Sequence, residues 1–454
     1  MLLVSRFAIL FLLFTLVPCA DAQSAAVIGG FGGGQSAYDG PDILGRGGPV
    51  SGRRGTEAVP IHVQASLNGT YDSNILGYSV DSSGNLRAIS SVGVTADVSA
   101  SGRKVWRRSF LGLDYSGNYS HFARQSLFNG TNHQLNLAWG TQIGQKLQIN
   151  SQVGAATSNR FLGGQSAFQS SEFEFLSAPM QELFDSRTYF VGVSAGATYS
   201  LSSRQSFRVS GNGSSVRRRA RGLVDMQSYG ASGDYVRRLS RRTSMGFSYT
   251  FNHFDYSKVF GESDVHTLGG HFSRKVGRDW QFSGSLTGSD QSTVGVRSVA
   301  LDPVLASLLG RGSGAEVFES NNLLYGYSAS VVKRIRRSNA SFSAQRAIIP
   351  GNGYFLTSIN RTVSAGFSHS VSRDLAFNGN FGYSKLSSLG FTSGDFKGWT
   401  GGASATYKVS ESIGVNTRYD WRTFDLQKTT FGRTGYRVSI GLTYFPAQGP
   451  AGLF

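Results

Sequence analysis

The chain has 454 residues, of which 59 are glycine and 9 proline, and only 16% are charged, giving a formal net charge of +17. Glycine disfavours helix interiors by about 1 kcal/mol per site, so this composition favours many strands and excludes a helix-rich domain. The only cysteine, Cys19, lies in an amino-terminal apolar segment, which excludes disulfides, zinc–thiolate sites and cysteine nucleophiles from the rest of the chain.

The first residues have the pattern of a secretory signal. An apolar run from Phe7 to Val17 follows a short basic start and precedes Ala20-Asp21-Ala22, an Ala-x-Ala cleavage site. We therefore expect residues 1–22 to be a signal peptide. Lipid attachment at Cys19 is an alternative, which the bulky residues before it disfavour.

Residues 23–57 are rich in glycine and show no hydrophobic period, which predicts a disordered periplasmic tether. No later stretch approaches the 18 or more apolar residues that a membrane helix needs. If the mature chain crosses a membrane, it must therefore do so as a closed barrel.

From Ile61 onward, apolar and polar residues alternate over long segments. In the last segment Tyr436, Val438, Ile440, Leu442 and Tyr444 share one face, and Arg437, Ser439, Gly441 and Thr443 share the other. Strands of this length suit a bilayer, which needs about 9–11 residues, better than a soluble sheet, where about 5–6 are usual. Trp139, Tyr199, Trp399, Tyr407 and Tyr444 fit aromatic girdles, with packing between two soluble sheets as the alternative.

Short polar connections alternate with longer ones. The short ones are expected at 102–103, 144–145, 203–204, 241–242, 277–278, 336–337, 373–374 and 410–411. The longer ones are expected at 73–85, 121–130, 160–186, 217–224, 255–264, 290–320, 349–354, 386–396 and 426–434. This pattern predicts an all-β transmembrane antiparallel barrel over residues 58–446, with a tail at 447–454, short periplasmic turns and longer extracellular loops. Eighteen strands are expected, and sixteen is the alternative.

The segment Gly69-Thr70-Tyr71-Asp72-Ser73-Asn74-Ile75 ends the first expected strand. Its Tyr71, Asp72 and Asn74 resemble the Tyr-Asp-x-Asn signature of an outer-membrane β-barrel porin family, the beta-barrel porin 2 group, often linked to exopolysaccharide export. The resemblance implies an outer-membrane location and a barrel, and leaves the cargo open. From the residues alone, Asp72 and Asn74 supply too few oxygens for calcium, so we expect them to stabilise the turn into the first outer loop.

Period-two alternation points a set of charged residues into the barrel. The expected pore-lining residues are Arg108, Asp114, Arg208, Asp234, Arg238, Lys275, Arg418, Asp420 and Arg422, with Asp97 among them. This predicts a polar, mildly basic lumen, wide enough for a water-filled channel that prefers anions unless loops plug it. The plug candidates are residues 161–186 and 294–320, the second containing the apolar run Leu301 to Leu309.

Arg217, Arg218, Arg219 and Arg221 form an expected outer basic loop that would contact lipopolysaccharide phosphates or an acidic polymer. Basic pairs at the expected periplasmic turns, such as Arg336-Arg337, are interpreted as solvated anchors at the headgroup level.

A catalytic role is not predicted. Asp264 and His266 share a face near the outer rim and His253 lies on the neighbouring strand, but no metal-binding or hydrolase motif accompanies them. We expect no catalytic residue, no metal and no cofactor.

The leading hypothesis is a porin-like channel in the bacterial outer membrane, passive or gated by a partner, for hydrophilic and anionic solutes or polysaccharide. The alternatives are a plugged structural or adhesive barrel that binds glycans through its loops, and a soluble secreted glycan-binding β-protein. Expected partners are outer-membrane lipid, lipopolysaccharide, the barrel-assembly machinery and polysaccharide-export components. Nucleic acid is excluded because the chain has no compact basic domain.

Overall fold

The computed structural model describes residues 61–80, 86–123, 129–159, 187–219, 223–257, 261–300, 312–350, 356–389, 395–426 and 432–444, with residues 302, 304, 307, 308 and 310 between two of these ranges. The expected signal peptide (1–22), tether (23–57), tail (447–454) and first plug candidate (161–186) lie outside the described residues.

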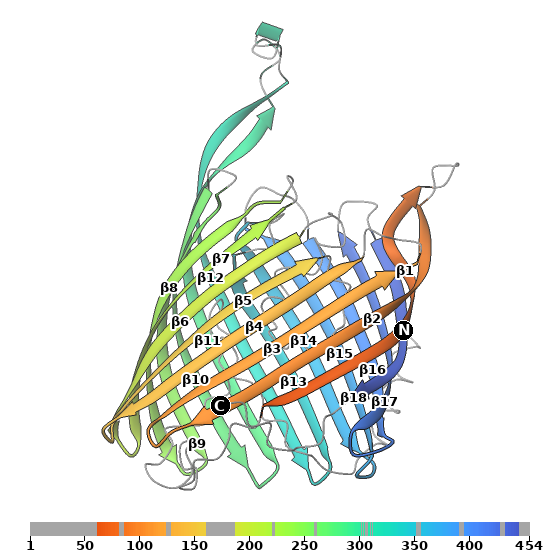
Figure 1. The fold of residues 1–454 in the computed structure, drawn as a ribbon. Coiled ribbons are helices and arrows are strands. Elements are labelled where there is room, and N and C mark those ends of the chain that lie inside the picture. Colours follow the sequence, from red (N-terminus) through yellow and green to blue (C-terminus); the bar gives the residue numbers. More distant parts are fainter. Residues whose placement is uncertain are drawn as a thin grey trace, which may run out of the picture.

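Eighteen strands form one antiparallel sheet that closes on itself (Figure 1). They are β1 (His62–Val80), β2 (Leu86–Val105), β3 (Ser109–Phe122), β4 (Gly130–Ile143), β5 (Leu147–Asn159), β6 (Arg187–Ser202), β7 (Gln205–Arg218), β8 (Met226–Ser240), β9 (Thr243–Asp255), β10 (Gly261–Val276), β11 (Trp280–Ala300), β12 (Ser313–Ile335), β13 (Ser338–Ile349), β14 (Ser358–Ser370), β15 (Leu375–Ser388), β16 (Asp395–Lys408), β17 (Ile413–Leu426) and β18 (Gly432–Tyr444). Neighbours in the chain pair with one another, and β1 pairs with β18 from Ala65↔Tyr444 to Asp72↔Arg437. The expected closed barrel of eighteen strands is confirmed.

Seven of the eight expected short connections coincide with the observed turns at one end of the barrel, called the short-turn end below. The glycines of two of them, Gly144 and Gly277, have φ of 64° and 65°, a left-handed conformation that tight strand connections favour.

The prediction for the β2–β3 turn is wrong, because the glycine at 102 does not end the strand. β2 continues to Val105, with Gly102 paired to Leu113, and the chain turns at residues 106–108, where the Trp106 N–H donates to the Ser109 carbonyl (2.7 Å).

The exterior of the barrel is apolar. Large side chains at alternate strand positions are exposed there, including Leu286 (74%), Leu268 (65%) and Phe247 (64%), and all five expected girdle residues are exposed by 41–54%. The alternate positions bury polar side chains such as Asn68 and Thr95 inside the barrel. A continuous apolar exterior is unfavourable in water and suits lipid, so the fold is that of a transmembrane barrel. No helix within the described residues is long and apolar enough to cross a membrane.

The β11–β12 hairpin extends beyond the opposite end, the long-loop end (Figure 1). Its strands stay paired from Trp280↔Lys333 to Ala300↔Ser313, so the described residues of 294–320 project away from the barrel and do not plug it. At the tip, Val304 and Leu308 are exposed by 66% and 76%. The plug prediction for this segment is wrong because the strands continue through it.

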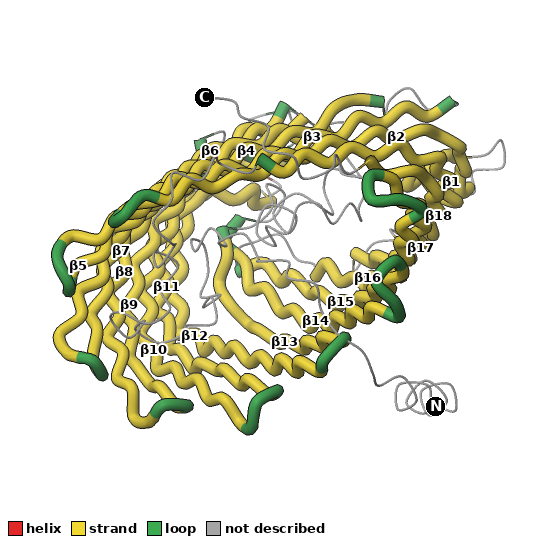
Figure 2. Tube along the Cα trace, turned by 60° about the horizontal axis from the view of Figure 1, so that its bottom comes forward, coloured by secondary structure: helices red, strands yellow, loops and turns green. Residues whose placement is uncertain are grey.

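The neighbouring strand β13 bends toward the barrel interior, whereas the β11–β12 hairpin projects away from the barrel (Figure 2). Only nine register pairs join β12 to β13, ending at Tyr327↔Arg346, whereas twenty-one join β11 to β12. Beyond Arg346, β13 leaves the wall and curves into the interior (Figure 2). The contact between β12 and β13 is therefore short, and the described end of β13, at Ile348 and Ile349, lies within the barrel.

Candidate functional site in the lumen

The inward hairpin packs on two walls of the barrel. Ile348 packs against an interior apolar cluster on the β7–β10 side, formed by Val216, Met226, Phe254, Tyr256 and Val265. The next residue, Ile349, is buried with Leu386 of β15 and Phe396 of β16. Consecutive residues of a strand point to opposite faces, so the hairpin contacts one wall with each face.

A tyrosine that follows β9 anchors the hairpin. The Tyr256 hydroxyl donates to the Pro350 carbonyl (3.0 Å) and is hydrogen-bonded to the Thr357 hydroxyl (2.9 Å). Tyr256 is 2% exposed and Thr357 is 1% exposed. Burial raises the pKa of Tyr256, which keeps the hydroxyl neutral and able to donate throughout the ordinary pH range. The hairpin is thus held across the lumen near the long-loop end.

Alternation along the sequence predicts an ordinary outer loop at residues 349–354 and does not predict the inward hairpin. A detectable feature exists: Ile348 and Ile349 are adjacent apolar residues that interrupt the strict alternation, just before Pro350. Two apolar neighbours in a strand indicate that both faces are covered, as in a buried strand.

At the barrel closure, one carboxylate holds two arginines. The Asp72 carboxylate accepts hydrogen bonds from Arg437 (2.8 Å) and Arg422 (3.0 Å), and its other oxygen accepts from the Asn74 backbone N–H (3.0 Å). Asp72 is fully buried, and Arg437 and Arg422 are 5% and 6% exposed. These residues join β1, β17 and β18, so the ion pairs connect the first strand of the barrel to the last two.

The role expected for the Tyr-Asp-x-Asn motif is therefore corrected. The strand does not end at Asp72 but continues to Val80, with a register irregularity after Asp72. Asp72 faces inward to the arginines, and the Asn74 amide donates to the Thr434 carbonyl (3.0 Å). Tyr71 lies on the exterior beside Tyr436, with ring centroids 6.0 Å apart. The motif closes the barrel and is not a turn.

A polar band continues from this closure on both sides. Arg418 and Asp420 form an ion pair on β17 (2.7 Å). On β2, the Asp97 carboxylate accepts hydrogen bonds from Asn118 (2.6 Å) and Asn68 (3.0 Å). The charges of this wall are largely paired with one another, so it is polar without a strong excess of either sign.

A second charged group lies on the opposite side, on β7, β8 and β10. Arg208 is the register partner of Asp234, and His271 lies 3.6 Å from Asp234. His271 reaches Asp234 across β9 because the intervening residue, Gly246, has no side chain. A Cβ at Gly246 would overlap the His271 ring and the Tyr235 carbonyl oxygen.

This arrangement makes a specific prediction. Gly246→Ala is expected to displace His271 and to destabilise the barrel by about 1–3 kcal/mol, as overpacked substitutions do. Gly270→Ala, on the neighbouring strand, is the matched control because its Cβ would make only ordinary contacts at 3.8–3.9 Å. Thermal unfolding of the two variants measures the difference. Equal unfolding temperatures would show that the glycine has no such role.

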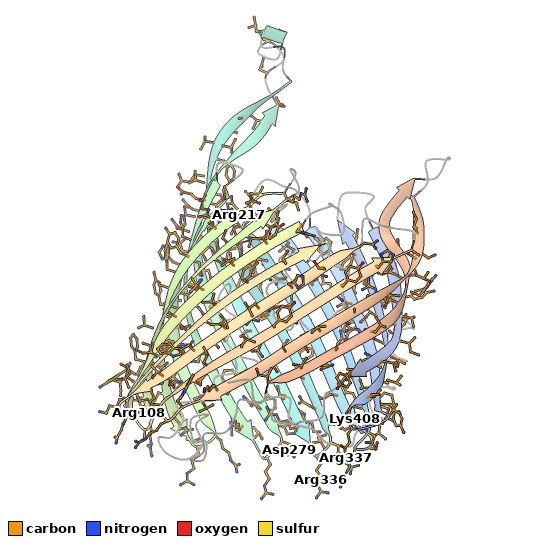
Figure 3. All side chains as sticks on the ribbon, viewed as in Figure 1. Arg108, Arg217, Asp279, Arg336, Arg337 and Lys408 are labelled. Atoms are coloured by element: carbon orange, nitrogen blue, oxygen red, sulfur yellow. The ribbon has the colours of Figure 1, made fainter. Side chains whose placement is uncertain are left out.

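The remaining predicted pore-lining residues separate into two groups. Asp114, Arg238 and Lys275 occupy inward positions of β3, β8 and β10, with Arg238 and Lys275 near the short-turn end. Arg108 does not line the pore. It lies exposed in the turn at residues 106–108, at the short-turn end of the barrel, where its carbonyl accepts from the Gln142 N–H (2.7 Å) (Figure 3). The displaced β2–β3 turn is the reason for this error.

Arg217 and Arg218 of the expected outer basic loop belong to strand β7, so their side chains point to opposite faces of the barrel wall. Arg217 is exposed at the long-loop end (Figure 3), whereas Arg218 is 5% exposed and donates to the Val224 carbonyl (2.6 Å). Arg218 is therefore not available to a ligand outside the barrel. Arg219 is exposed, and Arg221 lies outside the described residues.

The histidines near the long-loop rim form contacts on the exterior. His253 and Asp264 are 2.7 Å apart, and His266 is hydrogen-bonded to the Tyr249 hydroxyl (2.8 Å). In the part of the chain that the structure describes, no group of three or more His, Cys, Asp or Glu residues could hold a metal ion.

The fold and its interior define a transmembrane β-barrel with a polar lumen that an inward hairpin crosses near the long-loop end. No family model matches the sequence, and no curated protein matches it.

Several solved structures are similar to this chain at low sequence identity. OccK2 of Pseudomonas aeruginosa, in complex with glucuronate, is 12% identical with a TM-score of 0.42, over 86% of this chain and 98% of that one. The ferric-catecholate import receptor Fiu of E. coli K12 is 8% identical with a TM-score of 0.42, over 86% and 82% of the two chains. The FrpB iron transporter of Neisseria meningitidis is 12% identical with a TM-score of 0.41, over 81% and 62%. At this distance neither substrate nor mechanism is transferred to the present chain.

Proposed function

We propose that this chain is a bacterial outer-membrane channel for small hydrophilic solutes, with a preference for anions. The observation that carries the proposal is the closed barrel of eighteen strands with an apolar exterior and a polar interior. A barrel of this size has room for a water-filled path. The short turns would face the periplasm and the longer connections the outside.

The inward hairpin favours small solutes over a polymer. Ile348 and Ile349 contact interior clusters on two sides of the lumen, so the hairpin narrows the path near its outer mouth. An exopolysaccharide cargo has support only from the Tyr71–Asn74 resemblance, and it would require the hairpin to move. A barrel in which this hairpin completely closes the lumen, and which binds glycans through its loops, is the second candidate.

Anion preference is supported by the charged groups on the wall that faces away from the closure. Arg208 and Arg238 occupy inward positions there, and Asp234 is the carboxylate beside them. Cationic side chains on the wall of a water-filled path raise the local concentration of anions.

Reversal potentials in planar bilayers under a salt gradient test this proposal. The wild-type channel is expected to prefer anions, and Arg208→Gln with Arg238→Gln is expected to reduce that preference. Arg237→Gln is the matched control, because Arg237 is adjacent in sequence and points to the exterior. Cation preference in the wild type would contradict the charge argument, and absence of current from inserted protein would favour the closed barrel.

A further inference from the structure

Four cations lie side by side on the exterior of the barrel. Arg346 of β13 pairs in register with Arg361 of β14. Arg361 pairs in turn with Lys385 of β15, and Lys385 pairs with Lys397 of β16. Like charges at directly opposed positions are destabilising. A row of four such neighbours, called the cationic row below, therefore requires compensation by anions.

The position of the cationic row matches a membrane interface. Lys385 and Lys397 each lie two residues beyond an exterior aromatic residue, Tyr383 and Trp399, whose ring centroids are 4.4 Å apart. Two residues along a strand return to the same face, one step nearer the long-loop end. Tyrosine and tryptophan mark the boundary between acyl chains and headgroups, so the cationic row lies at the headgroup level.

Carboxylates of the chain compensate only one end of the row. Asp395 contacts Lys385 at 2.5 Å and Asp425 contacts Lys397 at 3.1 Å. Within the described ranges, neither Arg346 nor Arg361 has a carboxylate at ion-pair distance. Asp395 attracts Arg361 electrostatically only at longer range. The uncompensated charge is therefore at the β13–β14 end of the row.

Arg346 is the most unusual member. It is 7% exposed, and its Nε and Nη1 atoms are buried without a hydrogen-bond partner among the described residues. Its guanidinium lies over the Tyr325 ring, 3.7 Å from the centroid. The stack fixes the guanidinium at the point where β13 leaves β12, with donors still unsatisfied.

We propose that the cationic row binds the phosphate of an anionic glycolipid in the outer leaflet, with the exposed Arg361 as its main contact and the charge of the adjacent, stacked Arg346 adding to the attraction. Planar guanidinium groups bind phosphate oxygens through paired hydrogen bonds, more directionally than lysine does. Exposed apolar side chains on the adjacent strand β12, Leu323 (85%) and Tyr325 (67%), offer surface to the acyl chains. This inference rests on the proposed outer-membrane location and does not depend on whether the barrel conducts.

The refolded full chain in detergent micelles, supplied with lipopolysaccharide, tests the proposal. Phosphorylated lipopolysaccharide is expected to raise the unfolding temperature, and enzymatically dephosphorylated lipopolysaccharide is not. Arg346→Gln with Arg361→Gln is expected to bind the phosphorylated form at least about tenfold more weakly in native mass spectrometry. The control, Arg237→Gln with Arg274→Gln, removes two exposed exterior cations near the short-turn end, on the opposite side of the membrane, and should bind like the wild type.

Equal binding of both lipopolysaccharide forms, or full binding by the Arg346 and Arg361 double variant, would overturn the proposal. Stabilisation of the same size by inorganic phosphate would show a site for free anions and would overturn the assignment to a lipid. Conductance of the same preparations separates this result from the proposed channel function, since either can fail while the other holds.

Discussion

Releasing the inward hairpin is expected to increase the current through the barrel. Tyr256→Phe removes the hydroxyl that bonds to Pro350 and Thr357, and each lost hydrogen bond is worth about 1 kcal/mol. A loss of about 1–2 kcal/mol raises the population of the released hairpin by a factor of roughly 5–30. Single-channel recordings should therefore show more frequent and longer visits to a state of higher conductance.

A second substitution acts on the same hairpin without changing its hydrogen bonds. Ile348→Ser removes an apolar contact with the β7–β10 wall, at an expected loss of about 1–3 kcal/mol for a half-buried aliphatic side chain. The controls make the same chemical changes on the exterior: Tyr199→Phe and Ile413→Ser, whose side chains are 43% and 45% exposed. Unchanged conductance in both hairpin variants, with folded protein, would show that the hairpin does not limit the current.

Removing the carboxylate at the barrel closure is expected to cause a large loss of stability. Asp72→Asn leaves Arg437 and Arg422 buried without their shared counter-charge, and breaking such buried pairs typically costs about 3–5 kcal/mol. The temperature at which the barrel loses its compact migration on denaturing gels measures this loss. Asp114→Asn is the control, because Asp114 occupies an inward position of β3 without an ion-pair partner among the described residues.

A double substitution separates charge pairing from a general effect of the site. The double variant Asp72→Asn with Arg437→Gln removes one of the two buried arginine charges that Asp72→Asn alone leaves unpaired. It should therefore be less destabilising than the sum of the two single changes. Strict additivity would show that the two side chains do not interact, and a wild-type unfolding temperature for Asp72→Asn would contradict the closure role.

The sequence predicts the wall of the barrel well, because alternation with period two determines which side chain faces which side. It places Arg208, Asp234 and Arg422 correctly on inward positions, and it places Trp399 and Tyr444 on the exterior. The strand count follows from the alternation of short polar connections with longer ones; glycine marks only two of the observed short turns, at Gly144 and Gly277.

The lumen was predicted less well, because alternation does not reveal whether a strand stays in the wall. β11 and β12 keep the alternating pattern while they stay paired beyond the barrel rim, up to Ala300↔Ser313, and β13 keeps it while it bends inward. Long-range contacts decide both cases. The Asp72 pairs join residues about 350 positions apart in sequence, and the cationic row appears only when the register of four strands is known.

The measurement that tests the proposed channel most directly is thiol modification of single channels. The only cysteine of the chain is Cys19, in the expected signal peptide, so an introduced cysteine would be unique in the mature protein. Ser210 faces the lumen of β7, and its neighbour Val209 is 49% exposed on the exterior. A charged, water-soluble thiol reagent is expected to reduce the current stepwise in Ser210→Cys and to leave Val209→Cys unchanged. Complete labelling of Ser210→Cys without any change in current would contradict conduction through this lumen.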